Sequence, residues 1–299
     1  MNWKLLSLAA LVCGAAAPGL SAQEQAPARK AMFWKATSKD NAVYLLGSIH
    51  AGTKEMYPLA KEIETAFEES STLAVEADII HVDQSKIQSW VMKGMYEGDD
   101  SLWNHVNEET KQKMEKTCEL LAMSCVGLGK MKPWLLSVML PAMAMMKSGL
   151  DANLGIDRHF LEKAAKTPES KKILEIEGAE FQLKMLSSLE STMQAESLGQ
   201  ALAQIDKVKE ASVSMREAWM SGDVERMEAW LAKNMRGSEA MTKALLEDRN
   251  PAMADAAEQL LKSKSKGFVV VGAGHLVGKK GVVQLMRDRG YKVEQVALR

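Results

Sequence analysis

The amino-acid sequence predicts an α/β fold of the α+β type, with a central mixed sheet built from the N- and C-terminal segments and a large helical insertion between them. Two observations predict this class. Short apolar runs rich in β-branched residues gather near both ends of the 299-residue chain, whereas roughly residues 84–265 carry mainly helical periodicity. We expect the strands from both ends to share one core, because a sheet must cover its apolar faces.

The N-terminal part of the sheet is expected to come from three strands. Met32–Ala36 and Ala42–Leu46 flank the polar turn 38–41, and Thr72–Glu76 is a third short apolar run. Before this third run, Pro58–Phe67 has apolar residues spaced by four, which is typical of a helix. The domain is therefore predicted to open as strand, strand, helix, strand.

The middle of the chain is predicted to be mainly helical, with one short strand at Lys172–Ile176. The predicted helices include Glu108–Ala122, Trp134–Lys147, Asp157–Ala165, Ala179–Leu189 and Pro251–Lys264. The sheet is expected to resume with the buried strand Gly267–Gly272, a helix over Val277–Arg289 and a final strand at Lys292–Leu298.

Charge and composition exclude several classes of protein. The chain has 38 Lys and Arg against 39 Asp and Glu, and this near-balance argues against nucleic acid as a partner and against a polybasic membrane patch. With 46% hydrophobic residues, the chain is not intrinsically disordered. Aromatic residues make up only 5% but there are 21 methionines, so the core is expected to be aliphatic with methionine filling gaps.

Residues 1–22 are predicted to be a signal peptide. Lys4 precedes the apolar run Leu5–Cys13, and Leu20–Ala22 ends in a small residue suited to cleavage before Gln23. An N-terminal membrane anchor is the alternative, although the run is short for a spanning helix. The expected location is the periplasm or the medium. Residues 23–30 are interpreted as a linker and 31–299 as a single domain.

We expect no stable membrane span in the mature chain. The apolar stretch Trp134–Met146 is shorter than the roughly 20 residues that a spanning helix needs. It is predicted to be a buried helix or a helical cap. A methionine-rich groove for an apolar peptide is the alternative.

Cys118 and Cys125 remain after Cys13 leaves with the signal peptide, and an oxidising compartment permits a disulfide between them. In an unbroken helix their Cα atoms would lie about 10 Å apart, too far for the bond. The disulfide is therefore expected only if the helix breaks near Met123 and Ser124.

The motif Gly-x-x-His occurs twice, each time after an apolar strand. Gly47 to His50 follows the strand Ala42–Leu46, and Gly272 to His275 follows the apolar strand residues Phe268–Val271. Glycine lets the backbone turn and leaves room for a ligand. The histidines are expected at the carboxyl edge of the sheet, where open α/β folds bind their ligands.

Two carboxylates follow other predicted strands. Glu76 ends the strand Thr72–Glu76, and Glu177 comes just after Lys172–Ile176. If all these strands are parallel, two imidazoles and at least one carboxylate converge. This is a ligand set for a divalent transition metal, which would activate a water for hydrolysis while a remaining carboxylate acts as general base.

Each of these residues also has a structural alternative. Glu76 can be a solvated strand-end charge, and Glu177 can cap the helix that starts near Ala179. Arg249 and Asn250 precede Pro251 in a helix-start pattern with Asn250 as the cap, but Arg249 can also pair with a site carboxylate or bind a substrate carbonyl. His81 and His105 are expected on the surface.

Other catalytic motifs are absent from the sequence. It contains no Gly-x-Ser-x-Gly nucleophile elbow, no phosphate-binding Gly-x-x-x-x-Gly-Lys-Ser/Thr loop and no His-Glu-x-x-His. Gly272 and Gly274 lack the third glycine of a dinucleotide fingerprint, so NAD binding is not expected.

A set of short motifs, spread in order over most of the mature chain, resembles those of the TraB/GumN family, whose relatives include the Tiki proteases and the pheromone-shutdown proteins. The motifs are Tyr44–His50, Leu73–Asp78, Lys132–Trp134, Gly155–Asp157, Glu177 with Gln182, Arg249–Asn250 and Val270–Leu276. The resemblance implies a Tiki-like fold in which the two Gly-x-x-His motifs and a glutamate line a metal-dependent peptidase site. By position these ligands are His50, Glu76 and His275, and the metals implied are manganese, cobalt or zinc.

The leading hypothesis is an exported, metal-dependent hydrolase that acts on a peptide or protein substrate. His50 and His275 would bind the metal, Glu76 would complete the shell or act as base, with Glu177 as a further carboxylate, and Arg249 would stabilise developing negative charge. Two alternatives stay open. One is a non-catalytic protein that sequesters peptides, and the other is an esterase-like hydrolase in which a histidine acts without metal.

Overall fold

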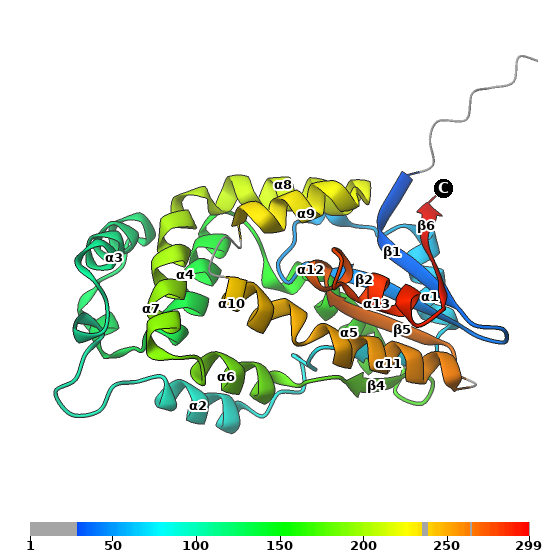
Figure 1. Cartoon of the computed structure of the whole chain (residues 1–299), viewed down its shortest axis with the longest axis horizontal. Coiled ribbons are helices and arrows are strands. Elements are labelled where there is room, and N and C mark those ends of the chain that lie inside the picture. The colour runs from blue at the N-terminus through cyan, green and yellow to red at the C-terminus, as the bar shows by residue number, and fades with distance from the viewer. Residues whose placement is uncertain (1–28, 235–238, 264, 299) are drawn as a thin grey trace, which may run out of the picture.

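The computed structural model describes residues 29–234, 239–263 and 265–298 (Figure 1). The predicted signal peptide, residues 1–22, and most of the predicted linker lie outside these ranges. The last two linker residues already belong to the first strand, which begins at Arg29.

The described chain builds a six-stranded mixed sheet in the order β4-β3-β5-β2-β1-β6. The strands are β1 (Arg29–Thr37), β2 (Ala42–Ser48), β3 (Thr72–Val75), β4 (Lys172–Glu175), β5 (Gly267–Gly272) and β6 (Lys292–Leu298). Neighbours from β4 to β2 are parallel, and β1 pairs antiparallel with both β2 and β6. The α/β class and the sheet assembled from both ends of the chain are therefore confirmed.

The register aligns the ends of the parallel strands. Val43 of β2 and Thr72 of β3 both pair with Gly267 of β5, and Ser48 pairs with Gly272 at the other end of β2. Strand β5 lies inside the sheet, and Gly267 to Val271 are all buried. An uninterrupted apolar run suits this position, because a central parallel strand is covered on both faces.

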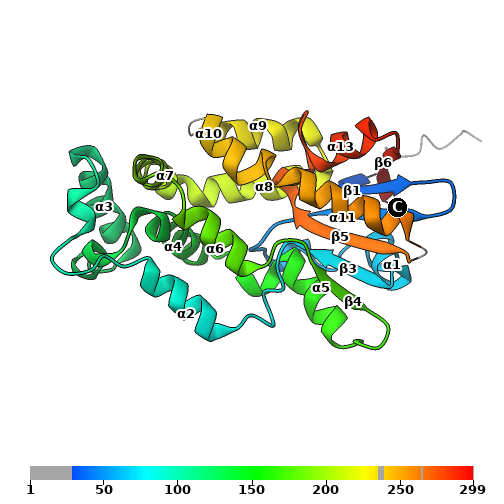
Figure 2. The ribbon, with the colours of Figure 1, turned by 60° about the horizontal axis from the view of Figure 1, so that its bottom comes forward.

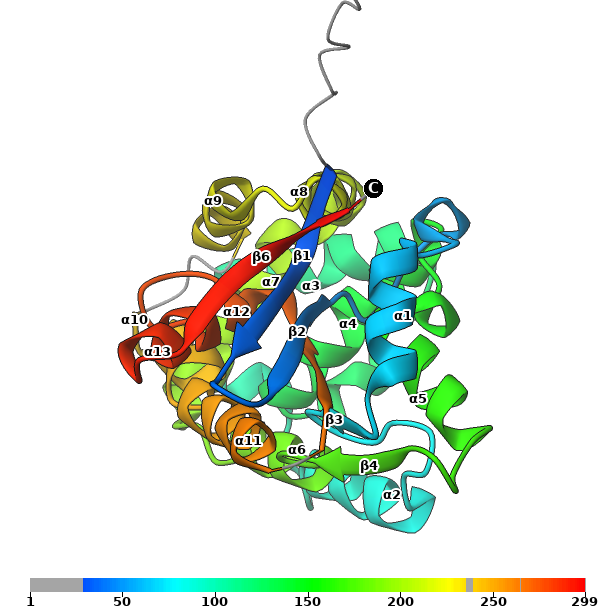
Figure 3. The ribbon, with the colours of Figure 1, turned by 90° about the vertical axis from the view of Figure 1, so that its right-hand side faces the viewer.

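Helices cover both faces of the sheet (Figure 3). One face carries α1 (Lys61–Glu69) and α5 (Ile156–Ala165), and the other carries α11 (Asn250–Lys262) and α13 (Val282–Asp288). Phe160 contacts both Phe67 of α1 and Phe268 of β5, with ring centroids 4.9 Å apart in each pair. These aromatic contacts fix α1 and α5 against the strand that leads to His275.

The insertion forms a helical lobe beside the sheet, made of α2 (Gln84–Lys93), α3 (Glu108–Leu121), α4 (Pro133–Lys147), α6 (Ala179–Ser187) and α7 (Ser191–Gln204) (Figure 1). It has an apolar core of its own, which includes Leu102, Met114, Leu136, Leu140, Leu198 and Leu202. Farther along the chain, α8 (Val208–Ser221) returns to the sheet and is followed by α9 (Val224–Asn234) and α10 (Glu239–Thr242). Its Trp219 donates a hydrogen bond from Nε1 to the Gly47 carbonyl at 2.6 Å.

The disulfide between Cys118 and Cys125 is present, with the Cα atoms 5.7 Å apart. Helix α3 ends at Leu121, and Ala122 adopts a left-handed conformation with φ of 56°. The helix therefore breaks just before the predicted Met123–Ser124, which brings the two cysteines within bonding distance.

The predicted helix over Val277–Arg289 is wrong in its first half. The structure has a short helix α12 (Ala273–Leu276), then a loop, and α13 begins only at Val282. Gly278 has φ of 86°, and a Cβ on Gly281 would lie 2.2 Å from the Val277 carbonyl oxygen. These two glycines therefore form a turn that a continuous helix cannot contain.

None of the helices in the described ranges has the length and apolar character needed to cross a membrane. Helix α4, the most apolar predicted stretch, buries Trp134, Leu136, Leu140 and Ala144 in the protein, as predicted for a core helix.

Candidate functional site

Four parallel strands deliver the predicted site residues to one edge of the sheet. His50 follows β2, Glu76 follows β3 and Glu177 follows β4. His275 lies in α12, immediately after β5. Because the strands are parallel and in register, their carboxyl ends meet, and the structure brings all of these side chains together.

His50, Glu76 and His275 surround one point above Gly272. A Cβ built on Gly272 would lie 3.3 Å from Glu76 Oε1, 3.4 Å from His275 Cδ2 and 3.8 Å from His50 Nε2. Gly272 has φ of −49° and ψ of 136°, which other residues also adopt. Glycine therefore leaves space beside Glu76 here and does not serve a turn, which corrects half of the expectation for this motif.

Gly47 serves the other motif in the same way. Its own Cβ would lie 3.0 Å from both Ala273 Cα and Met32 Cβ. The absence of a side chain lets β2 approach α12 closely, which brings the two histidine-bearing segments together.

The His275 ring is buried and held by Asn250. Its Nδ1 lies 2.7 Å from Asn250 Oδ1, and its Nε2 faces Glu76 Oε1 at 3.8 Å. Burial lowers the pKa of His275 to about 4, although the charge of Glu76 opposes this shift. With this lowered pKa, the His275 ring is neutral near pH 7. Asn250 was predicted to cap a helix, but α11 already includes it and its side chain turns toward His275.

The His50 ring is held by Asp157, which lies in the first turn of α5. His50 Nδ1 is 2.8 Å from Asp157 Oδ2, while 68% of the His50 side chain is exposed. Burial of part of the ring lowers the pKa of His50, but the hydrogen bond and charge of Asp157, together with the charge of Glu76, outweigh it and raise this pKa to about 9. Since solvent screens an exposed ring, we interpret this shift as a preference of the site for positive charge.

A buried ion network fixes Glu76 from behind. Arg249 donates from Nη2 to Glu76 Oε2 at 2.7 Å, and from Nε and Nη2 to the two oxygens of Glu177 at 2.8 and 2.7 Å. Gln182 of α6 donates to Glu76 Oε2 at 3.0 Å and to Glu177 Oε2 at 3.2 Å. With Oε2 occupied, Glu76 Oε1 accepts from the Gly272 N–H at 2.6 Å and faces the two histidines.

Glu177 and Glu76, two of the predicted site residues, are both held inside this network. The Glu177 side chain is only 3% exposed and bonds to Arg249 and Gln182, so it does not cap α6. Burial raises the pKa of Glu76, but the charges of His275, His50 and Arg249 outweigh it and lower this pKa below its usual range, so Glu76 is ionised near pH 7. Helix α6 lies between the sheet edge and α4, so Gln182 joins the helical lobe to the site (Figure 2).

Sequence reasoning missed two supporting roles. Asp157 was predicted only to begin a helix and Asn250 only to cap one, yet each holds the Nδ1 of one site histidine. The signal was present in the resemblance, because both residues belong to its motifs, but no spacing rule connects them to His50 and His275.

The donor set suits a divalent cation. A metal–nitrogen bond of about 2.0–2.1 Å and a metal–oxygen bond of about 2.0–2.2 Å together exceed the 3.8 Å between His275 Nε2 and Glu76 Oε1, so one ion can contact both atoms. Oxygen partners on the Nδ1 atoms are what metal-binding imidazoles commonly have. In the described ranges, no three such side chains already enclose a metal position, so a single ion bound by His50, Glu76 and His275 would require these side chains to move closer together.

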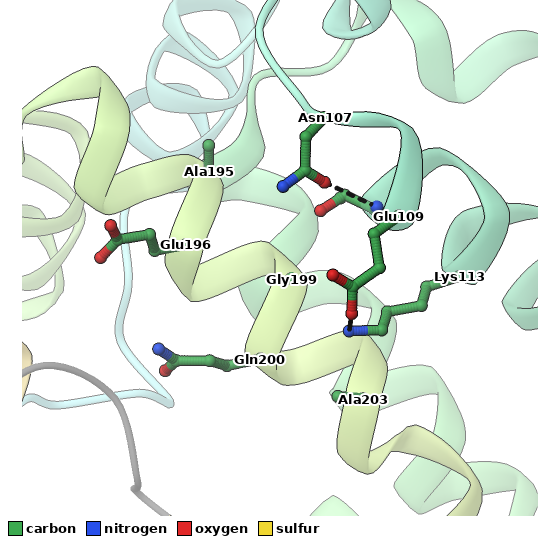
Figure 4. A pocket seen from close by; sticks show the side chains of 9 residues that line it. Asn107, Glu109, Lys113, Ala195, Glu196, Gly199, Gln200 and Ala203 are labelled. Carbon is green, nitrogen blue, oxygen red and sulfur yellow. Dashed lines mark hydrogen bonds and ion pairs between the residues drawn. The ribbon is translucent and has the colours of Figure 1, made fainter.

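A separate cavity of about 300 Å³ lies in the helical lobe, between α3 and α7 (Figure 4). Its lining includes Asn107, Glu109, Lys113, Glu196 and Gln200. Glu109 and Lys113 pair with each other at 2.7 Å, and none of the predicted site residues contributes to it. The convergence of histidine and carboxylate at the sheet edge, and not this cavity, defines the candidate site.

The fold and the site define a class of α/β protein in which two Gly-x-x-His segments and a glutamate meet at the carboxyl edge of a mixed sheet. The chain belongs to the TraB/PrgY/gumN family, whose family model matches residues 32–295.

Two relatives show how far the similarity extends. "Uncharacterized protein YbaP" of Escherichia coli (strain K12) is 26% identical over 244 residues, which cover 82% of this chain and 87% of the relative. An "Uncharacterized protein" of Treponema pallidum (strain Nichols) is 23% identical over 276 residues, covering 87% of this chain and 81% of the relative. No solved structure matches the chain.

Proposed function

We propose that this protein is an exported, metal-dependent hydrolase that cleaves a peptide bond in a peptide or protein substrate, as the resemblance to Tiki proteases implies. The observation that carries the proposal is the convergence of His50 Nε2, Glu76 Oε1 and the His275 ring around the point above Gly272. Manganese, cobalt and zinc all accept imidazole and carboxylate ligands.

Each residue of the candidate site has its own role in the proposed reaction. A divalent ion bound here would polarise the scissile carbonyl and supply an activated water. Glu76 would complete the ligand set or accept a proton from that water, because its Oε1 faces the same point. Arg249 and Glu177 hold Glu76 in this orientation, and Arg249 Nη1 also donates to the Leu245 carbonyl at 2.8 Å. Stabilisation of developing negative charge by Arg249 would therefore depend on its one remaining Nη1 hydrogen.

Calorimetric titration with Mn²⁺, Co²⁺ and Zn²⁺ tests the ligand assignment. We expect His50→Ala and His275→Ala each to abolish metal uptake while the protein stays folded. The matched control is His81→Ala, because His81 also places Nδ1 on a carboxylate, that of Asp78 at 2.7 Å, and its side chain is 59% exposed. Equal affinity in the wild type and both site variants would refute the assignment.

A metal-independent hydrolase is the second candidate, and the pairing of His50 with Asp157 favours it. The carboxylate orients the ring, and above its raised pKa of about 9 the ring is neutral, so that Nε2 can take a proton from water without any metal, as in a histidine general base. Incubation of the purified protein with a peptide library and with simple esters, before and after chelation, separates the two. Cleavage lost on chelation and restored by Mn²⁺, Co²⁺ or Zn²⁺ supports the metal-dependent proposal, and cleavage that survives supports the second candidate.

The same assay tests a non-catalytic alternative, in which the protein binds peptides without cleaving them. Retention of intact peptide by metal-loaded protein, with no products, would replace hydrolysis by sequestration.

Export to the periplasm or the medium is the remaining part of the proposal. The support is the apolar stretch of residues 1–22 and the disulfide, since disulfides persist in oxidising compartments. Mass analysis of the protein from a cell fraction tests it, because the mature chain should begin at Gln23. An intact N-terminus in the cytoplasm would contradict export.

A further inference from the structure

Asn250 lies behind the site, at the first position of α11, and is only 3% exposed. Its side chain makes two hydrogen bonds. Nδ2 donates to the Lys280 carbonyl at 2.8 Å, and Oδ1 lies 2.7 Å from His275 Nδ1. The amide is thus fixed between a main-chain acceptor and the imidazole of a site histidine.

The orientation of this amide follows from its partners. The Lys280 carbonyl can only accept a hydrogen bond, so it must face the Asn250 NH₂ group. A flipped amide would place two oxygens against each other and the NH₂ group against His275. The oxygen of Asn250 therefore faces the ring, and the ring nitrogen opposite to it must carry the proton.

The proton on Nδ1 determines the state of the other ring nitrogen, Nε2. A neutral imidazole carries one proton, and with that proton on Nδ1 its Nε2 holds a lone pair. The Nε2 atom lies 3.8 Å from Glu76 Oε1, which is another acceptor. Two acceptors at this separation are an arrangement that a cation can bridge.

We infer that Asn250 is a positioning residue that fixes His275 as the Nδ1–H tautomer and so presents Nε2 for metal binding. The tautomer is a property of the metal-free protein, whereas its use in metal binding rests on the function proposed above. Asn250 acts through His275, because its polar atoms are engaged with His275 and Lys280.

An amide at position 250 suits the charge balance around His275 better than a carboxylate would. Asp157 places a carboxylate oxygen beside Nδ1 of His50 in the same way, but that ring is mostly exposed. Around His275, Glu76 and Glu177 already place two negative charges against the single charge of Arg249. A third buried carboxylate would add an uncompensated charge, whereas an amide supplies the acceptor without one.

Nitrogen NMR of the histidine side chains tests the tautomer. At pH 8, above the ordinary imidazole pKa of about 6.5, the His275 signals (assigned by their loss in His275→Gln) should show a protonated Nδ1 and an unprotonated Nε2 in metal-free protein. Asn250→Ala should shift the ring toward the other tautomer or a mixture. Asn250→Asp keeps the acceptor and should keep the tautomer, even if the loss of the bond to Lys280 lowers stability.

The matched control is Asn41→Ala. The Asn41 amide also donates to main-chain carbonyls, those of Leu260 at 2.9 Å and Ser263 at 2.8 Å, but it precedes β2 at the opposite end of that strand from the site. It should leave the His275 signals unchanged. A protonated Nε2 in the wild type, or an unchanged ring in a folded Asn250→Ala protein, would overturn the inference.

Calorimetry on the same variants tests the metal part. We expect Asn250→Ala to weaken metal binding about 10–100-fold, the usual effect of removing the partner of a ligating histidine, with Asn250→Asp closer to the wild type. Unchanged affinity in Asn250→Ala would overturn the metal role of Asn250. If the wild type binds no metal at all, the proposed function fails, while the NMR result still decides the tautomer.

Discussion

At the scale of single residues, Gly272 shows how the absence of a side chain creates the site. Gly272→Ala adds a methyl group that would lie 3.3 Å from Glu76 Oε1 and 3.8 Å from His50 Nε2, at the point that the donors surround. The backbone angles suit alanine, so the fold should persist. We expect peptide hydrolysis to fall about 100-fold, as for misplacement of reacting groups by roughly 1 Å, and metal affinity to fall with it.

Gly127→Ala is the matched control for this prediction, since a Cβ there would meet nothing within 4 Å. Wild-type metal affinity and activity in a folded Gly272→Ala protein would contradict the placement of the site above Gly272.

Also at the residue scale, Glu177 is predicted to matter for stability. Glu177→Gln leaves the buried guanidinium of Arg249 with Glu76 as its single carboxylate partner, in a network where both side chains are 10% exposed. We expect the free energy of unfolding to fall by about 1–3 kcal/mol, since the amide has one acceptor oxygen in place of two and leaves one of the buried Arg249 donors without its partner. Urea denaturation measures it.

The same substitution at Glu180 is the comparison, because its pair with Lys86 is exposed, with side-chain exposures of 58% and 62%. Its loss should cost less than about 1 kcal/mol. Equal effects at the two positions would show that the buried network does not contribute as described.

At the scale of elements, the contact between α1 and α5 is predicted to depend on pH. Glu64 of α1 accepts from His159 Nε2 at 2.9 Å and from Lys163 Nζ at 2.5 Å, both on α5. Burial raises the pKa of Glu64, but these two hydrogen bonds and the charges of His159 and Lys163 outweigh it and lower this pKa below its ordinary value of 4.5. The stabilisation should therefore be complete above pH 4.5 and disappear as the pH falls through the lowered pKa.

Denaturation of Glu64→Gln at several pH values checks this prediction. The difference in unfolding free energy from the wild type should be largest near pH 7 and shrink in acid. Glu115→Gln, at an exposed glutamate of α3, is the control and should show no such trend. A difference that is independent of pH would contradict the role of the Glu64 charge.

The disulfide gives a second prediction at this scale. Replacing both Cys118 and Cys125 by serine should lower the free energy of unfolding by about 2.5 kcal/mol, the chain-entropy estimate for a loop of this length. Metal binding should not change, because the disulfide lies in the helical lobe, outside the candidate site. Denaturation with Ser124→Ala as control measures the first effect. A loss of metal affinity would show that the lobe and the site are coupled.

The elements also show what the sequence could and could not predict. Two strands have the predicted bounds, because β-propensity acts locally: Gly267–Gly272 is a buried apolar run, and Lys292–Leu298 mixes apolar with polar residues. The helix before the last strand was mispredicted, because Gly278 and Gly281 form a turn that periodicity does not reveal. The strand order depends on long-range pairing, so the sequence showed which residues end strands but not which strands are neighbours.

At the scale of the whole molecule, a sheet built from both ends of the chain is joined to a helical lobe inserted between them. His50 and His275 are far apart in the sequence and meet only because β2 and β5 are parallel neighbours. The lobe contributes Gln182, which reaches both site carboxylates through α6. The site is therefore a product of the complete fold and not of any one segment.

The central claim is that one ion is held by both histidines and Glu76. The most direct measurement is anomalous X-ray diffraction from crystals of the protein loaded with Mn²⁺, Co²⁺ or Zn²⁺. We predict one strong anomalous peak at the carboxyl edge of the sheet, within about 2.0–2.2 Å of His50 Nε2, His275 Nε2 and a Glu76 oxygen. A fully loaded crystal with no peak at this edge, or with the ion bound elsewhere, would contradict the account.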